Sequence, residues 1–434
     1  MKTIKGEIVL LLQEKINWRN IVKMLGKDFT EIKDENIVDK KIVLPSEQNS
    51  KFNEYRTYAE RKKGVFKSGT SEISITYDKG STVVKGQKVY VNEIVLSKIS
   101  GHKIDCIKLA MRLTKKHKIV LEARTHEQRI KSIVNGTEYG RFHVKEFSSR
   151  TVGEAIEDLM WWHLCGISQA GAEFCLHKAE RLPVRRLRVE LRKLRAVLTM
   201  LEKVLLPDVA KWQEKLRSLT IKLAPVRELD VALSGWRSTA LNKRKYSFAA
   251  DKLAIFLHKA RIAEVNKIKE DFEFVNFTPF LLEIMHWAMN DPIKQGKSDV
   301  LLEKIADKKL ANWFTAMQKI VKAHPDFDDD ELAHEIRIKA KTSRYVMQSM
   351  SGKAFGDNNK VMRSIKRLQD ALGVLHDNYI NEEIAREIVK KQANHSLIYQ
   401  AGIFVGNERA QALRVRKLLP DLFDKFASDW HKWY

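Results

Sequence analysis

The pattern of apolar and polar positions divides the chain into two parts near residue 147. Over the first 147 residues, short segments rich in Ile, Val, Thr and Tyr alternate with glycines and asparagines, which is typical of strands and turns. These features predict an α+β domain over 1–147, dominated by an antiparallel sheet. The predicted strands are 5–12, 41–44, 72–77, 82–84, 89–98 and 118–123, and a helix is predicted over 104–116.

From residue 148 onward, apolar residues recur at three- and four-residue spacing over long stretches, which indicates helices. Ser148 or Ser149 is predicted to cap a first helix that begins near Thr151. Breaks rich in Gly, Pro, Asp and Asn divide the remainder into about ten helices. We therefore predict an all-α domain over 148–434, with repeat halves at about 148–290 and 291–434. The breaks lie at 182–183, 207–208, 291–296, 325–330 and 352–359.

Two of these helices share a pattern of cations at an offset of 149 residues. The first begins at Pro183, which suits a first helical turn, and the second covers 333–345. On each helix the cations fall within an arc of roughly 80°, beside an apolar stripe that can dock on the rest of the domain. The first row is Arg185, Arg188, Arg192 and Arg195; the second is His334, Arg337, Lys341 and Arg344.

A basic row on a helix is usually a solvated face or part of i,i+4 ion pairs. Here Glu190 is the only acidic residue from Arg185 to Arg195, so local pairing cannot neutralise the first row. Like charges at this spacing repel one another, yet the arrangement occurs twice. An external chain of phosphates would relieve the repulsion, and the guanidinium group suits phosphate oxygens. The two rows are therefore candidate anion-binding residues.

A second element follows each basic helix, at 223–230 and at 368–377. The first contains Arg227, and the two end in the carboxylates Asp230 and Asp377. Each carboxylate either orients an arginine of the basic row or caps a helix end, and the sequence leaves both interpretations open.

The overall charge supports a polyanionic partner. The chain carries 79 Lys and Arg against 55 Asp and Glu, a net charge of +24, which favours nucleic acid, polyphosphate or an acidic membrane surface. The three cysteines have no metal-binding spacing and fit a reducing compartment. The apolar stretch 8–12 is too short for a signal sequence, and no later run is long enough to span a membrane. We expect a cytoplasmic protein without a membrane partner.

Together these segments resemble the CHAD family, the conserved-histidine α-helical domains. The family is marked by a His-x-x-Arg-Val-x-x-Arg-Arg-Leu-Arg helix, an Arg-Asp-x-Asp turn, a second His-x-x-Arg-Ile helix, and a Leu-Gln-x-x-Leu-Gly-x-x-x-Asp segment. Their counterparts here begin at Arg185, Arg227, His334 and Leu368, in the same order. The resemblance spans about residues 150–434. It implies two pseudo-symmetric helical bundles around a basic groove that binds inorganic polyphosphate, and a location at polyphosphate granules.

The chain departs from the family pattern at three places. Arg185 stands where the first name-giving histidine belongs, whereas His334 keeps the second. The Arg-Asp-x-Asp turn reads Arg-Glu-Leu-Asp at 227–230, and Thr342 occupies a usually basic position. Because Arg185 keeps a cation at its site, we expect anion binding to persist, whereas any role for a titrating histidine there is put in doubt.

The N-terminal part resembles a degenerate CYTH domain, the triphosphate tunnel fold that often precedes a CHAD region. The segment 125–129 stands where that family has Ser-Lys-x-x-Arg. The family's Glu-x-Glu-x-Lys strand would hold a metal over a triphosphate, but Glu7 and Glu93 are each followed by apolar residues where the second acid belongs. We expect no metal site, no cofactor and no hydrolase activity.

The leading hypothesis is thus non-enzymatic binding of polyphosphate, or of another polyanion, by the predicted cations. One alternative is a metal-dependent triphosphatase in the N-terminal domain. The other is nonspecific nucleic-acid binding through the same basic surface, since no motif for reading bases is present. The predicted binding residues are Arg185, Arg188, Arg192, Arg195, Arg227, His334, Arg337, Lys341 and Arg344.

Overall fold

The structure, a computed structural model, forms two compact units. One comprises Met1–His143, Met160–Leu176 and Glu270–Pro292, and the other Val144–Leu159, His177–Lys269 and Ile293–Tyr434. The predicted boundary near residue 147 lies outside the described residues and stays a prediction. The described residues are 7–12, 16–45, 52–84, 86–115, 119–122, 124–134, 150–176, 181–242, 251–268, 272, 274–350, 358–391 and 394–434.

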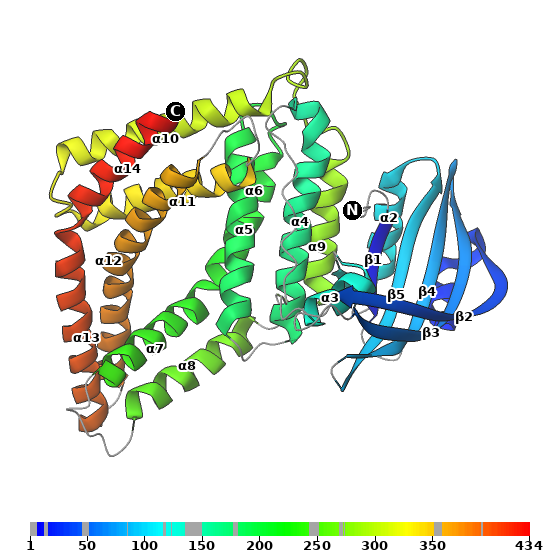
Figure 1. Ribbon diagram of the computed structural model, residues 1–434, viewed down its shortest axis with the longest axis horizontal. Coiled ribbons are helices and arrows are strands. Elements are labelled where there is room, and N and C mark those ends of the chain that lie inside the picture. The colour runs from blue at the N-terminus through cyan, green and yellow to red at the C-terminus, as the bar shows by residue number, and fades with distance from the viewer. Residues whose placement is uncertain are drawn as a thin grey trace. The chain divides into compact units, whose positions relative to one another are not determined.

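The first unit contains a six-stranded antiparallel sheet, which confirms the predicted fold class of the N-terminal part (Figure 1). Ile73, Ile75 and Tyr77 alternate with less buried residues along one strand, as a sheet with one apolar face requires. The order is β2-β3-β4-β5-β1-β6. The strands are β1 (Glu7–Leu12), β2 (Phe29–Pro45), β3 (Phe52–Ser68), β4 (Ser71–Val84), β5 (Gln87–Ser100) and β6 (Ile119–Glu122).

Helices pack with this sheet in the same unit. They are α1 (Trp18–Leu25), α2 (Lys103–Thr114), α3 (His126–Val134), α9 (Phe274–Ala288) and part of α4 (Val152–Leu176). The N–H of Leu121 in β6 donates to Thr278 Oγ1 of α9 at 3.4 Å, and Ser168 Oγ of α4 donates to the Leu121 carbonyl. The first unit therefore includes helical segments from beyond residue 148.

The second unit is helical, and its first helix begins close to where the sequence placed it. Thr151 caps α4 in a capping box: the Glu154 N–H donates to Thr151 Oγ1 and the Thr151 N–H donates to Glu154 Oε2, at 3.3 and 2.9 Å. The predicted caps Ser148 and Ser149 lie outside the described residues. The other helices are α5 (Arg181–Leu201), α6 (Val209–Lys222), α7 (Ala224–Asn242), α8 (Lys252–Ile268), α10 (Leu302–Ala323), α11 (Asp330–Ser349), α12 (Asn359–Lys391), α13 (His395–Arg416) and α14 (Leu419–Trp433).

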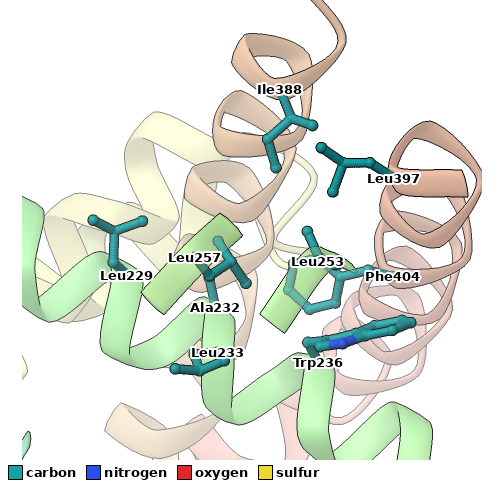
Figure 2. Packing of buried hydrophobic residues seen from close by; sticks show 9 residues of the cluster. All are labelled: Leu229, Ala232, Leu233, Trp236, Leu253, Leu257, Ile388, Leu397 and Phe404. Atoms are coloured by element: carbon teal, nitrogen blue, oxygen red, sulfur yellow. The ribbon is translucent and has the colours of Figure 1, made fainter. Parts of the chain in front are cut away.

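Four of these helices meet in an apolar cluster (Figure 2). Trp236 of α7 and Phe404 of α13 pack edge to face, with ring centroids 6.3 Å apart. Leu253 and Leu257 of α8 and Ile388 of α12 fill the space beside them. Truncating a buried aromatic such as Phe404 to alanine costs about 3–5 kcal/mol. This cluster therefore ties helices of the first half, α7 and α8, to helices of the second, α12 and α13.

Candidate functional site

A cavity of about 310 Å³ lies among α5, α7, α11 and α12, within the second unit. It contains most of the cations that the sequence singled out, including Arg227, which α7 contributes. Basic helices that are 149 residues apart in the sequence thus line the same cavity. The predicted residues on that wall are Arg185, Arg188, Arg192, Arg227, Arg337, Lys341 and Arg344.

The apolar stripes explain how these cations reach the cavity. Leu187, Leu191, Leu194 and Leu198 of α5 are fully buried, as the sequence predicted. On α11 the corresponding stripe is Ile336, Ala340, Ser343 and Met347, and it is buried as well. Because α5 and α11 contact each other and both bury these stripes, the flanking basic rows converge on the cavity.

Several cavity donors have no hydrogen-bond partner among the described residues. Arg188 Nη1, Arg337 Nε and Arg344 Nε are buried nitrogens of this kind, and so is Gln369 Nε2 of α12. A buried donor left unpaired typically costs about 1–3 kcal/mol, so such groups are few in folded proteins. Their gathering in one cavity indicates a site made to receive oxygen atoms from a ligand.

Burial and mutual repulsion disfavour the charged forms of the cations in this cavity. Burial lowers the pKa of Lys341 to about 6, and Arg337 and Arg192 beside it lower that pKa further. Burial likewise lowers the pKa of Arg188 to about 9 and that of Arg337 to about 10. Both arginines therefore stay charged at neutral pH, whereas Lys341 is largely uncharged until an anion arrives.

Three carboxylates line the cavity, Asp377, Glu228 and Asp370, and the last pairs with Lys366 of its own helix. Asp377 Oδ1 of α12 is 4.0 Å from Arg337 Nη2, which places this carboxylate beside an arginine of the basic row. Burial raises the pKa of Asp377 and that of Glu228 on α7. Asp230 behaves differently, since it pairs with Arg261 at 2.6 Å and with Arg181 at 3.7 Å, outside the predicted rows.

Two predicted residues do not line this cavity. Arg195 faces α6: burial lowers its pKa most, and Arg217 of α6 and Arg192 of α5 lower it further. His334 is exposed and lines a neighbouring cavity of about 360 Å³, where its ring centroid is 5.0 Å from that of His376.

Sequence reasoning missed part of the wall that α12 supplies. Gln369, Gly373, His376 and Ile380 line the cavity together with Asp377. They recur at three- and four-residue spacing, which places them on one face of the helix. That spacing was visible in the sequence, but the residues are chemically mixed and carry no common charge.

The sheet of the first unit has a polar face whose charges are matched internally. Arg61 of β3 donates twice to Asp78 of β4, both at 2.6 Å, and Arg124 donates to Glu122 at 3.1 Å. Arg129 of α3 pairs with the buried Glu93 of β5. The glutamate and the arginine that carried the CYTH resemblance thus bind each other. Within the described ranges, no group of three or more His, Cys, Asp or Glu side chains is placed to hold a metal ion.

The cysteines and the hydropathy of the helices can be compared with the predictions from the sequence. Cys106 and Cys165 are buried free thiols, and the side chain of Cys175 is not described. Among the helices that the structure describes, none is long and apolar enough to cross a membrane.

Comparison with known proteins identifies the helical region. A family model of the CHAD domain matches residues 171–386, the segment that contains the basic helices and the cavity. This chain carries a CHAD domain. No curated protein matches the sequence.

Two solved structures are similar to this chain. The CHAD domain from the plant Ricinus communis is 18% identical, with a TM-score of 0.50, and the match covers 68% of this chain and 97% of that one. PptA from Streptomyces chartreusis is 15% identical, with a TM-score of 0.48, and the match covers 64% and 99%. At such low identity the likeness to the Ricinus communis domain shows that the CHAD domain here shares its fold.

Proposed function

We propose that the CHAD domain binds inorganic polyphosphate in the cavity among α5, α7, α11 and α12, without catalysing a reaction on it. The observation that carries this proposal is the set of buried arginine nitrogens without partners: Arg188 Nη1, Arg337 Nε and Arg344 Nε. Phosphate oxygens accept hydrogen bonds from guanidinium groups in the strong, charge-assisted manner. A bound anion would therefore remove both the unpaired donors and the repulsion between the rows.

The dimensions of the cavity favour polyphosphate over duplex nucleic acid. Polyphosphate is an unbranched string of phosphates without bulky substituents, so a segment of it can enter a space of about 310 Å³. In a duplex the phosphates lie on the outside of a wide cylinder that cannot enter. A duplex would reach exposed cations such as Arg185 but not buried donors such as Arg337 Nε. Duplex binding, if it occurs, is then nonspecific and steeply dependent on salt.

In this proposal the first unit, which resembles a CYTH domain, serves as a scaffold and not as a triphosphatase. Hydrolysis would need carboxylates free to hold a divalent metal, and Glu93, Glu122 and Asp78 each contact an arginine. These carboxylates do not form the donor set that such a metal requires. Magnesium-dependent release of phosphate from tripolyphosphate by the purified protein would favour the enzyme instead.

A binding titration with long-chain polyphosphate tests the proposal. Duplex DNA, heparin and pyrophosphate serve as competitors at near-physiological salt, and an Arg188→Glu/Arg337→Glu variant is titrated in parallel. We expect tight binding that DNA does not displace and that the variant loses. Equal binding of every polyanion, little changed in the variant, would mean diffuse charge attraction and would refute the proposal.

A further inference from the structure

The second cavity, of about 360 Å³, adjoins the basic one and shares His376 and Ile380 with it. Its other walls are the first turn of α11 and one face of α12. Leu372, Leu375 and Tyr379 belong to that face, and their spacing is helical. The two cavities thus meet at His376 and Ile380, where the chemistry of the lining changes.

The second cavity is unsuited to further phosphates. Asp330 and Glu331 lie on its wall; Asp330 pairs with Arg416, and the Glu331 carboxylate opposes the entry of an anion there. Its histidines are uncharged at neutral pH, because burial and the nearby arginine Arg337 lower the pKa of His334 and bring that of His376 to about 3. The wall is otherwise apolar or aromatic, as in pockets that take the flat, uncharged part of a ligand.

Several groups in this cavity suit a heteroaromatic ring. The imidazoles of His334 and His376 lie 5.0 Å apart with an interplanar angle of 38°, and the described residues give neither ring a hydrogen bond. Tyr379 is 60% exposed and so presents its ring to an incoming group. Base rings stack on such side chains, and the exocyclic amine of a purine donates to a carboxylate such as that of Glu331.

We infer that the two cavities together bind a purine nucleoside oligophosphate, with its phosphates among the arginines of the basic cavity and its base beside His376 and Tyr379. This inference rests on the proposed function for the phosphate half of the ligand. It adds a second ligand class and a subsite that distinguishes a nucleotide from bare phosphate. Each cavity is within the range of about 300–1,000 Å³ typical of small-ligand sites.

The test compares ATP with tripolyphosphate in calorimetric titrations without divalent metal. Both ligands carry three phosphates, but the ester bond of ATP leaves it with less negative charge. A site that senses charge alone therefore binds tripolyphosphate more tightly. We expect the reverse, with ATP bound roughly tenfold tighter, because a stacked base adds affinity of that order.

Two variants separate the subsites. Tyr379→Ala removes an exposed ring outside the basic cavity, so it should abolish the preference for ATP and leave tripolyphosphate binding unchanged. Tyr58→Ala is the matched control, because Tyr58 is a similarly exposed tyrosine (54%) of the first unit. It should change neither affinity.

The outcomes distinguish this inference from the proposed function. If ATP binds no more tightly than tripolyphosphate, or if Tyr379→Ala preserves its advantage, the base subsite is refuted while polyphosphate binding stands. If ATP binds tightly and Tyr379→Ala weakens it, but long-chain polyphosphate does not bind, the base subsite stands and the polyphosphate proposal falls.

Discussion

The basic cavity of the second unit and the polar sheet face of the first use arginine in opposite ways. On the sheet, Arg61 donates to Asp78 through two hydrogen bonds, and this partner raises the pKa of Arg61. In the cavity, Arg188 and Arg337 are more deeply buried, and this burial lowers their pKa values to about 9 and 10. Arginine side chains are thus paired with carboxylates on the sheet face, whereas those in the cavity keep donors without a partner.

The difference teaches that exposure and charge count alone do not identify an anion site. Arg129 is well buried, but its nearest carboxylate, that of Glu93, already occupies it. Arg337 has only Asp377 at 4.0 Å and keeps a buried nitrogen without a partner. An arginine can bind an anionic ligand where the fold places too few carboxylates near it. The unpaired arginine lowers the stability of the folded protein there.

The largest effect on polyphosphate affinity should come from removing positive charge from the basic cavity. Arg188→Gln/Arg337→Gln should lower polyphosphate affinity at least about a hundredfold, since each charge-assisted contact contributes roughly 1.5–3 kcal/mol. The free energy of unfolding should be unchanged or should rise, because like charges are removed. Titration and denaturant unfolding measure the two quantities.

Arg129→Gln is the matched change on the sheet face, and it should show the opposite result. Leaving the buried Glu93 carboxylate without its partner should lower the free energy of unfolding by about 3 kcal/mol, while polyphosphate affinity stays the same. If the cavity variant lost stability and the sheet variant lost binding, the contrast between the two regions would be wrong.

A smaller effect is expected from pH. Lys341, facing Arg188 and Arg192 of α5 and Arg337 of α11, has a pKa of about 6 in the free protein, and Asp377 of α12 offsets this only in part. Bound phosphates favour its protonated form, so affinity should fall as pH rises above about 6, by at most about tenfold per unit for one proton. Isothermal titration from pH 6 to 8 with long-chain polyphosphate measures the slope.

The same group gives a prediction for stability. The unfolded chain holds the Lys341 proton up to its ordinary pKa of 10.5, whereas the folded protein releases it near 6, so the unfolded state binds more protons between these values. The thermal midpoint of the free protein should therefore rise with pH over that window. Lys341→Arg keeps the charge at all these pH values, and it should flatten both profiles; an unchanged slope would assign the titration to another group.

The smallest effect concerns the single carboxylate paired with the basic row. Asp377→Asn removes the counter-charge of Arg337 and should raise polyphosphate affinity about threefold, in line with the modest contribution of partly exposed ion pairs. The measurement is the same titration as for the arginine variants. A loss of affinity would instead mean that Asp377 chiefly holds Arg337 in position.

Much of the fold could be predicted from periodicity, and the misses have physical causes. Strand β3 was not predicted because the buried Thr57 and the half-buried Arg61 share a face with Ala59, so polar residues hide the usual alternation. Helix α1 is short, yet Trp18, Ile21 and Leu25 are spaced as in a helix, and Asn17 caps it. These signals are local and were available in the sequence.

The site was predictable only to the level of single helices. A row of cations on α5 or α11 follows from helical geometry, whereas the direction each cation faces depends on how the helices cross. Arg195 therefore faces α6, and His334 lies beside His376, although both belong to the predicted rows. Gln369 belongs to the segment 368–377 that the sequence singled out, but its place on the cavity wall could not be foreseen, because nothing in one sequence pairs α12 with α5.

The apolar cluster of Figure 2 has a consequence for the order in which the chain is made. Its hydrogen bonds join residues far apart: the Leu253 N–H donates to Gln400 Oε1 across 147 positions, and Asn407 donates to Thr239 across 168. At ordinary rates of synthesis, about 5–20 residues per second, α7 and α8 wait on the order of 10 s for α13 to leave the ribosome. During that interval Trp236 and Leu257 lack the residues of α12 and α13 that bury them, so we expect the first half of the helical unit to expose apolar surface until the second half is made.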